Sequence, residues 1–324
     1  MCSDIPSPGS LRAGLVVKPC AAERTDAPLV TVVTVCFNPL KGGRETLLRR
    51  NLDSVQGQEG VTAEHLIVDG ASEDGTPELV KAYVNPRHEV RLFSKADNGI
   101  YDAMNRGIAL ARGKYVTFLN SDDFYHRPDG LSLSVKALEE SGCGFSFAPI
   151  VPTGAFFLHR LHRHPERHLH RIFIFPTIPH QSMLYRRTVL VGAGGYDSSY
   201  RMGGDHDLTL RLVAAGCKGC FVDKAFVTFS SGGFSTQDAT LKFREKMRRV
   251  RRFHKEVFGV EFSDAEAETL VRHYRYPRRC LSTYVASQHL IGRTFVYGIP
   301  RSLWYRLRRR FNYWKYYLKC RFGI

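Results

Sequence analysis

Carboxylate side chains follow apolar runs at several points of the chain, and two of these positions could carry chemistry. Asp122 and Asp123 follow an apolar run that ends at Leu119. Adjacent carboxylates repel each other, so a bound cation would relieve the cost of holding them together. Mg²⁺ and Mn²⁺ prefer carboxylate and phosphate oxygens, and they neutralise leaving groups that carry much negative charge. Asp205 opens a helical pattern, where one carboxylate could take the proton of an attacking hydroxyl group.

Two further polar positions are candidate contacts to a ligand. Asp69 follows another apolar run, and an ionised carboxylate, which only accepts hydrogen bonds, suits an N–H group of a ligand. Asp97 and Asn98 precede Gly99 and a helical pattern. The free N–H groups at the start of that helix favour an anion nearby, and Gly99 permits close approach of the backbone.

Each of these positions also has a purely structural alternative. The Asp122-Asp123 pair could cap the following helix. Asp69 could cap its own turn, and Asp97 or Asn98 could be an N-cap. Asp205 could be the N-cap of its helix. Asp207, two residues further along the same pattern, is the rival proton acceptor.

The elements that must position these residues alternate between strand and helix patterns. The strands are expected over 29–37, 63–68, 90–93 and 115–119, and the helices between them over 45–55, 76–84 and 100–111. This alternation predicts an α/β fold with a mainly parallel sheet and helices on both faces. Ligands of such sheets bind beyond the carboxyl ends of the strands, which is where the polar clusters fall. These clusters begin at Asn38, Asp69, Asp97 and Asp122.

The chain beyond residue 123 is less regular and ends in a strongly basic segment. We expect a short strand over 182–185, a helix over 205–215, a strand over 219–229 and basic helices over 241–258 and 301–322. The net charge is +16, and residues 241–324 hold 21 Lys or Arg against 6 Asp or Glu. These changes in composition predict a flexible leader over 1–27, a folded domain over 28–240 and a basic amphipathic helical tail over 241–324.

Six stretches in order resemble glycosyltransferase family 2, whose members are inverting enzymes with a GT-A fold. The stretches are TVVTVCFN (31–38), VDGASEDGT (68–76), DNGIYDAMNRG (97–107), FLNSDD (118–123), PHQSMLYRR (179–187) and GGDHDLTLRL (203–212). The resemblance implies a Rossmann-like GT-A domain, with a nucleotide-sugar half over 28–123 and an acceptor half over 124–240. Moving a sugar from a nucleotide diphosphate also fits the predicted cation, because the leaving group is highly charged.

The resemblance implies a role for each candidate residue. Asp123 would bind the divalent metal, Mn²⁺ or Mg²⁺, and Asp205 would be the general base. Asp69 would accept a hydrogen bond from the base, generally uracil. The other implied contacts are Asp122 to the ribose or donor sugar, Phe37 and Asn38 to the nucleotide pocket, Asp97, Asn98 and Asp102 to the donor, and His180 and Gln181 to the acceptor.

The sequence departs from the family pattern at three points. Ser121 stands where many relatives have another Asp, which removes one potential ligand. Gly204 replaces the Glu that usually precedes the base. Many relatives have a His near the metal, and residues 227–231 (VTFSS) offer none.

The function that these features predict is transfer of a sugar from a nucleotide-diphospho-sugar, preferably UDP-linked, to a lipid-linked or polysaccharide acceptor. A sugar-phosphate nucleotidyltransferase is the first alternative, but 38–43 (NPLKGG) is a poor substitute for that class's Gly-rich basic loop. An inactive, basic membrane-binding or nucleic-acid-binding protein is the second alternative. It predicts loss of the acidic site residues, yet Asp69, Asp123 and Asp205 are present.

The location expected from the sequence is the cytoplasmic face of the inner membrane, as a peripheral protein. No secretory signal or run of about eighteen apolar residues is present. A 3-4-3-4 apolar stripe, flanked by basic residues, fits a helix lying on an anionic bilayer. The stripe consists of Trp304, Leu307, Phe311, Trp314 and Leu318. A helix packed on the catalytic domain is the alternative, and no nucleic-acid partner is expected because no recognition motif is present.

Histidines and cysteines do not predict a further metal site. Residues 155–171 hold five histidines interleaved with arginines, which would oppose a cation and favour a mobile acceptor loop or lid. Cys217 and Cys220 form a C-x-x-C pair without the second pair that a zinc site needs. We therefore expect reduced cysteines, with this pair in a packing role.

Overall fold

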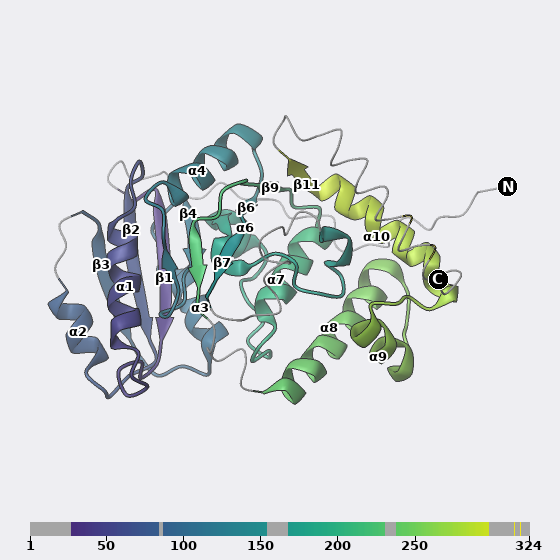
Figure 1. Cartoon of the computed structure of the whole chain (residues 1–324), viewed down its shortest axis with the longest axis horizontal. Coiled ribbons are helices and arrows are strands. Elements are labelled where there is room, and N and C mark those ends of the chain that lie inside the picture. Colours follow the sequence, from purple (N-terminus) through teal and green to yellow (C-terminus); the bar gives the residue numbers. More distant parts are fainter. Residues whose placement is uncertain are drawn as a thin grey trace.

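The computed structural model describes residues 27–83, 87–153, 168–230 and 238–297, together with Trp314 and Leu318. In this part of the chain an eight-stranded sheet has the order β11-β9-β6-β8-β4-β1-β2-β3, and a three-stranded sheet has the order β5-β10-β7. Helices lie against the large sheet on both of its faces (Figure 1).

The amino-terminal half is a regular alternation of strands and helices, as its sequence predicts. The strands are β1 (Val30–Cys36), β2 (Ala63–Asp69), β3 (Glu89–Ser94) and β4 (Tyr115–Phe118). The helices are α1 (Glu45–Gln56), α2 (Thr76–Ala82) and α3 (Ile100–Leu110). The pairs β1–β2, β1–β4 and β2–β3 are all parallel. Their carboxyl ends therefore meet at one edge of the sheet.

Alternate strand residues face opposite layers of helices. Val33 and Val35 of β1 pack in one cluster with Met104 of α3. Cys36, the next residue along β1, packs in another cluster with Leu48 of α1. Because successive side chains of a strand point to opposite faces, α3 covers one face and α1 covers the other. The predicted two-sided, mainly parallel sheet is confirmed.

The second half is built from shorter elements. They are β5 (Phe124–Tyr125), α4 (Gly130–Ser141), β6 (Phe145–Phe147), β7 (Ile150–Pro152), β8 (Leu184–Arg186), α6 (Arg187–Gly192) and α7 (Gly204–Ala214). Two three-residue 3₁₀ turns, η2 (Leu169–Arg171) and η3 (His180–Ser182), lie between β7 and β8. Strand β8 runs antiparallel between β4 and β6, which makes the sheet mixed at this point.

The single strand predicted over 219–229 is wrong. The segment forms β9 (Gly219–Phe221) in the large sheet and β10 (Val227–Phe229) in the small sheet. Asp223 and Lys224 interrupt the apolar run between them. Strand β10 pairs with β5 and β7 in the small sheet. Ser230, the residue after β10, bonds to Asp123 in the loop that follows β4.

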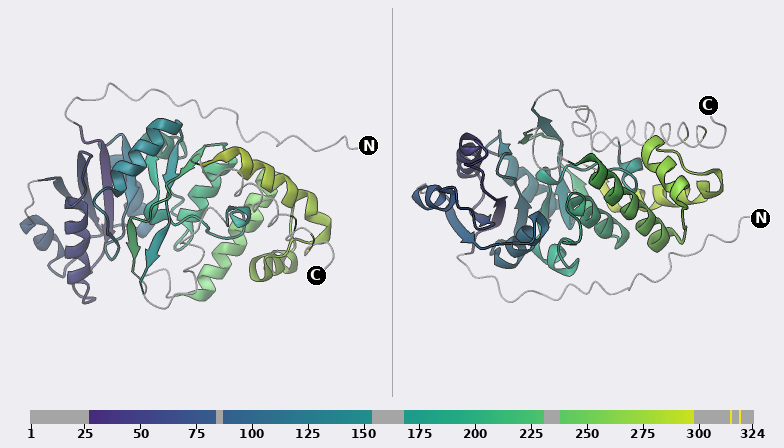
Figure 2. Two further views of the ribbon diagram at one scale, coloured as in Figure 1. Left: turned by 45° about the horizontal axis from the view of Figure 1, so that its top comes forward. Right: turned by 90° about the horizontal axis from the view of Figure 1, so that it is seen from below.

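The basic C-terminal segment is packed onto the rest of the chain. It forms α8 (Ala239–Phe258), α9 (Asp264–His273), a 3₁₀ turn η5 (Arg278–Cys280), α10 (Leu281–Thr294) and β11 (Phe295–Tyr297). The three α-helices gather at the end of the molecule away from α1 and α2 (Figures 1 and 2). Strand β11 pairs in parallel with β9, so part of the segment expected as a separate tail belongs to the large sheet.

Several predicted features lie outside the described residues. They are the leader apart from residue 27, the 154–167 part of the histidine-rich stretch, and the stripe residues Trp304, Leu307 and Phe311. Trp314 and Leu318 are helical, and their exposed fractions are 55% and 44%. Within the described ranges, none of the helices has the length and apolarity needed to cross a membrane.

Candidate active site

The loop after β4 gives its two aspartates different environments. Asp123 is fully buried, and its Oδ1 accepts a hydrogen bond from the backbone N–H of Ser230 at 2.8 Å. Its Oδ2 accepts from Asn120 Nδ2 at 3.3 Å, and the side chain of Gln181 also donates to it. Burial, followed by the charge of Asp122, raises the pKa of Asp123 well above its usual range.

Asp122 is the more accessible of the pair. Its side chain is 14% exposed, and Arg44 Nη1 lies 3.7 Å from its Oδ2. Burial raises the pKa of Asp122, and the positive charge of Arg44 opposes that rise. The loop itself is anchored through its backbone, because Asn51 Nδ2 donates to the carbonyls of Asn120 and Asp123, both at 2.9 Å.

The turn after β2 holds Asp69 by local hydrogen bonds. Asp69 is fully buried, and its Oδ2 accepts from Ser72 N at 2.9 Å and from Ser94 Oγ at 2.6 Å. The Ser72 hydroxyl donates to Asp69 Oδ1 and accepts from Asn38 N at 2.7 Å. Asn38 Oδ1 accepts from Glu73 N at 3.0 Å. The predicted pair Asn38 and Asp69 is therefore brought together, and both side chains order this turn.

Phe37 and Asp97 converge on the backbone of Gly70. The Phe37 side chain is exposed, with a fraction of 66%. A Cβ atom on Gly70 would lie 2.9 Å from Asp97 Oδ2 and 3.1 Å from the Phe37 ring. Asp97 Oδ1 already accepts from Gly99 N at 2.9 Å. An aromatic face and a carboxylate oxygen therefore lie together at the carboxyl edge of the sheet.

Asp102 and Asn98 stabilise the start of α3. Asp102 Oδ2 accepts from Asn98 N and from Arg106 Nη2, both at 3.0 Å. Arg106 also donates to the carbonyls of Lys95 and Ala96. This network fixes the turn that presents Asp97, and the Asn98 side chain remains exposed.

Asp205 lies in the first turn of α7, between groups from two other elements. The hydroxyl of Tyr101 on α3 lies 3.3 Å from its Oδ1, and His180 Nδ1 on η3 lies 3.5 Å from its Oδ2. Its side chain remains 25% exposed. Burial raises the pKa of Asp205, but the hydrogen bond and charge of His180 and the backbone N–H of His206 outweigh it and lower the pKa below its usual range. Asp205 is therefore ionised at neutral pH.

Asp207, the rival base, has a different environment. It is fully buried, and Arg211 Nε donates to its Oδ2 at 2.8 Å. Arg252 Nη2 donates to its Oδ1. Both carboxylate oxygens of Asp207 are bound to guanidinium groups, and the side chain is fully buried. Asp205 is the aspartate of this helix turn whose side chain is partly exposed.

The turn η3 links the two acidic centres. His180 contacts Asp205, and the adjacent Gln181 donates to Asp123. Ser182 fixes the turn by donating to the carbonyl of Ala148 at 2.7 Å. The predicted residues Asp123, His180, Gln181 and Asp205 thus form one connected network, although they are far apart in sequence.

Sequence reasoning missed several residues of this network, notably Tyr101 and Ser230. A Cβ atom on Gly204 would lie 2.9 Å from the Tyr101 ring, which is too close for an ordinary contact. The lack of a side chain at Gly204 therefore accommodates Tyr101 beside Asp205. Burial, then the charge of Asp205, raises the pKa of Tyr101 well above its usual range, so its hydroxyl stays protonated and able to donate.

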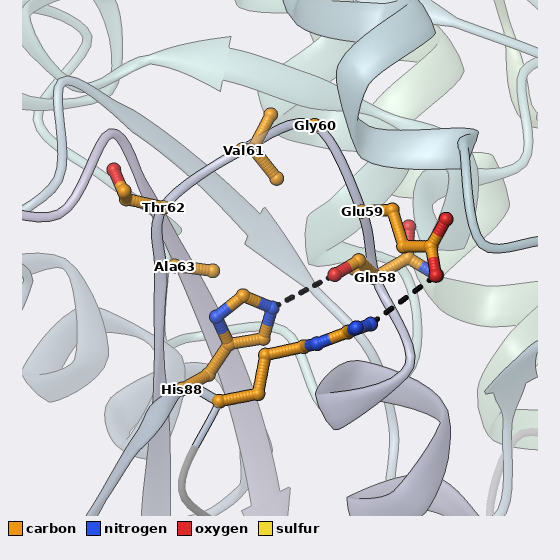
Figure 3. A pocket seen from close by; sticks show the side chains of 8 residues that line it. Gln58, Glu59, Gly60, Val61, Thr62, Ala63 and His88 are labelled. Carbon is orange, nitrogen blue, oxygen red and sulfur yellow. Dashed lines mark hydrogen bonds and ion pairs between the residues drawn. The ribbon is translucent and has the colours of Figure 1, made fainter.

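A hollow of about 570 Å³ lies away from these residues (Figure 3). It is lined by Gln58, Glu59, Gly60, Val61, Thr62, Ala63, Arg87 and His88. Its wall includes Ala63, the first residue of β2, so it opens at the amino edge of the strands. Arg87 pairs with Glu59, and His88 bonds to the carbonyl of Gln58, which leaves these groups engaged in local contacts. The predicted site residues Asn38, Asp69 and Asp122 lie at the opposite edge, where β1, β2 and β4 end.

The described residues contain no group of three or more His, Cys, Asp or Glu side chains arranged to hold a metal ion. Asp122 supplies one accessible carboxylate. Mg²⁺ is commonly held by one or two carboxylates together with substrate phosphates and waters. The residues present therefore fit a cation that binds with a diphosphate, and they do not form a site enclosed by protein alone.

Known proteins resemble this chain over most of its length. Residues 31–193 match the family model described as Glycosyl transferase family 2. An uncharacterized glycosyltransferase of Mycobacterium tuberculosis is 30% identical over 241 residues, covering 71% of this chain and 86% of that protein. The succinoglycan biosynthesis protein ExoO of Rhizobium meliloti is 40% identical over 116 residues, covering 36% of this chain and 31% of ExoO.

Two solved structures share the fold at low sequence identity. Residues 1–349 of TarS from S. aureus, in complex with UDP-GlcNAc, align with a TM-score of 0.58 and 16% identity, covering 91% of this chain and 92% of that one. The mannosyltransferase PcManGT from Pyrobaculum calidifontis, in complex with GDP-Man and Mn²⁺, aligns with a TM-score of 0.56 and 18% identity, covering 95% and 92%.

Proposed function

The chain belongs to glycosyl transferase family 2 and has a GT-A fold, and from this premise we propose that it is an inverting transferase that uses a UDP-linked sugar. The observation that carries the proposal is the position of Asp205. Its carboxylate is ionised, partly exposed and connected through η3 to Asp123, in the loop that follows β4. A single displacement needs such a base together with a site for a charged leaving group.

The proposed reaction is one displacement at the anomeric carbon. The acceptor oxygen forms a bond to that carbon while the bond to the diphosphate oxygen breaks, and the diphosphate leaves with the bonding electrons. Asp205 takes the proton of the acceptor hydroxyl. Tyr101 on α3 contacts one oxygen of Asp205, and His180 on η3 contacts the other. These two contacts orient the carboxylate for the proton transfer.

We assign the donor nucleotide to the carboxyl ends of β1, β2 and β3. The exposed ring of Phe37 offers a face on which a base can stack, and the neighbouring Asp97 carboxylate can accept from a base N–H. Asp69 and Asn38 shape the turn beneath them. In this proposal Asp69 acts through the turn, because its oxygens already accept four hydrogen bonds, from Ser72 N, Ser72 Oγ, Ser94 Oγ and Cys36 Sγ.

We assign the divalent cation to Asp122 rather than to Asp123. Asp123 is fully buried and bound by Ser230, Asn120 and Gln181, so it positions the loop. The Asp122 side chain is 14% exposed and lies beside Arg44. When bound, Mn²⁺ or Mg²⁺ would neutralise charge on the diphosphate leaving group.

We propose a lipid-linked or polysaccharide acceptor at the cytoplasmic face of a membrane. The support is the similarity to a succinoglycan biosynthesis protein and the basic C-terminal segment. Trp314 and Leu318 are exposed and four residues apart in a helix, so they lie on one face. A nucleotidyltransferase is not favoured, because the similarity to an uncharacterized glycosyltransferase extends over 71% of this chain.

Membrane binding should depend on both charge and the apolar face. The full chain should sediment with phosphatidylglycerol vesicles at low salt and be released at high salt, because each basic residue near such a surface contributes about 1 kcal/mol. Replacing Trp314 and Leu318 by Ser should weaken sedimentation at low salt. Equal binding of this variant and the unchanged chain would contradict the assignment of the anchor.

The stereochemistry of hydrolysis tests the proposed reaction without knowledge of the acceptor. With Mn²⁺ and an α-linked UDP-hexose, water should replace the acceptor, and ¹H NMR should detect the β-hexose first, before mutarotation. UDP-glucose, UDP-galactose and UDP-N-acetylglucosamine would be compared. Initial release of the α-hexose would contradict a single displacement.

A further inference from the structure

Helix α8 presents three charged side chains to the segment that carries Asp205. Glu245, Arg249 and Arg252 are spaced four and three residues apart, so they lie on one face of the helix. All three contact residues between Asp197 and Asp207. We call these three residues the α8 clamp. They lie outside the segment that matches the family model, which ends at residue 193.

Glu245 fixes the approach to α7. Its side chain is buried, with an exposed fraction of 7%. Its Oε1 accepts from Arg201 N at 2.6 Å, and its Oε2 accepts from Met202 N at 2.9 Å. A buried carboxylate bonded to two consecutive N–H groups restricts the backbone directly before the helix start.

Arg249 makes the contacts nearest to Asp205. It is buried, and its Nη1 donates to the carbonyl of Gly203 at 3.1 Å. Its Nε donates to His206 Nδ1 at 3.0 Å, and His206 Nε2 donates to the carbonyl of Ile172 at 2.6 Å. Because Nδ1 accepts, His206 is neutral, with its proton on Nε2. Burial, then the charge of Arg249, holds the pKa of His206 well below its usual range.

The contacts of Arg249 therefore bracket Asp205 in the chain. Gly203 precedes it by two residues, and His206 follows it directly. A Cβ atom on Gly203 would clash with Arg249 Nη1, so a larger residue at this position would displace the guanidinium. Arg252, one turn further along α8, pairs with the buried Asp207 and extends the clamp past the first turn of α7.

We propose that α8 belongs to the catalytic apparatus, with Arg249 as a positioning residue that holds the orientation of Asp205. The inference rests on the proposed role of Asp205 as base. The titratable groups facing Asp205 are His180 from η3, Tyr101 from α3, His206 beside it and Arg249 from α8, with Tyr185 and Tyr196 further away. Arg249 is the one permanent cation among these six side chains.

The proposal gives part of the basic C-terminal segment a role inside the molecule. Arg249 and Arg252 are directed at α7 and at its acidic first turn. Their charge is therefore not available to a membrane surface. An arginine at position 249 fits because one guanidinium can donate to two acceptors in a fixed geometry, which a lysine cannot do.

The test compares Arg249→Met and Arg249→Lys with Arg244→Ala, an exposed arginine on the same helix. The assay measures release of UDP from the UDP-hexose that the full chain hydrolyses fastest. UDP binding is measured by calorimetry, and stability is measured by thermal melting. Loss of the positive charge raises the pKa of Asp205, so in Arg249→Met the acid limb of the kcat profile should move to higher pH. We expect kcat to fall about 10–100-fold, while UDP affinity changes less than about threefold.

Arg249→Lys should keep the position of the acid limb and lose part of kcat, because the charge remains and one hydrogen bond is lost. Arg249→Lys also keeps the proposal testable if Arg249→Met fails to fold. A folded Arg249→Met or Arg249→Lys with unchanged kcat and an unchanged pH profile overturns the proposal. Asp205→Asn, measured alongside, separates the two ideas. If Asp205→Asn is inactive and the Arg249 variants are fully active, only the proposed role of the α8 clamp is contradicted. If Asp205→Asn is fully active, the proposed base is contradicted, and the inference that rests on it is contradicted too.

Discussion

Asp122→Ala should remove the metal-dependent part of UDP affinity. In the full chain, Mn²⁺ should tighten UDP binding by about 10–100-fold over EDTA, which corresponds to about 1.4–2.7 kcal/mol. The reason is that a cation held between Asp122 and the diphosphate joins two negative groups that otherwise repel each other. Without the accessible carboxylate, the affinities in EDTA and in Mn²⁺ should differ by less than about threefold. Isothermal titration calorimetry measures both values.

Asp123→Asn is the matched comparison, because it changes the neighbouring residue by a single atom. Its new amide group would face donors already present, Asn120 Nδ2, Gln181 and Ser230 N. We expect loss of about 1–3 kcal/mol of folding stability, seen as a lower Tm, with the Mn²⁺ dependence of UDP binding retained in the folded protein. If Asp123→Asn abolished that dependence and Asp122→Ala preserved it, Asp123 would be the metal ligand, as the family resemblance implies.

The amino-terminal half could be predicted from the sequence because its signals are local. Strand β1 is a run of β-branched residues, and all seven of its residues are buried. Such a run is typical of a strand covered on both faces, and the helical spacing between strands is equally clear. The polar residues at the carboxyl ends of these strands can therefore be assigned to one edge from the sequence alone.

The second half could not be predicted in the same way, because its elements are short and depend on distant partners. Strands β6, β7, β8, β9 and β10 have three residues each. Three residues are too few to show a period. Strand β10 separates from β9 because it pairs with β5 and β7, which lie far away in sequence.

The candidate residues were visible in the sequence, but their different environments were not. Nothing in the pair Asp122-Asp123 indicates which residue is buried, because Ser230 and Gln181 decide it from elsewhere in the chain. Tyr101 was hidden within a helical pattern, where an aromatic residue is typical of the core. Arg249 was hidden among the basic residues of the C-terminal segment, where its burial against α7 has no local signal.

Asp205→Asn tests the central claim most directly, because it separates chemistry from binding. The substitution keeps the shape of the side chain and removes its ability to take a proton at neutral pH. We expect kcat for the transfer or hydrolysis of a UDP-hexose to fall by about two to four orders of magnitude. UDP affinity should stay within about threefold of that of the unchanged chain, since Asp205 is not among the residues assigned to the nucleotide.

Asp207→Asn is the control for this measurement. Asp207 is buried between Arg211 and Arg252, so Asp207→Asn should lower the Tm by removing the charge that these two partly buried guanidinium groups pair with. The decisive measurement is kcat of both variants under conditions where calorimetry shows that each still binds UDP. The account predicts that folded Asp205→Asn is inactive and that folded Asp207→Asn retains turnover. A folded Asp205→Asn with kcat within about tenfold of the unchanged chain, beside an inactive folded Asp207→Asn, would contradict it.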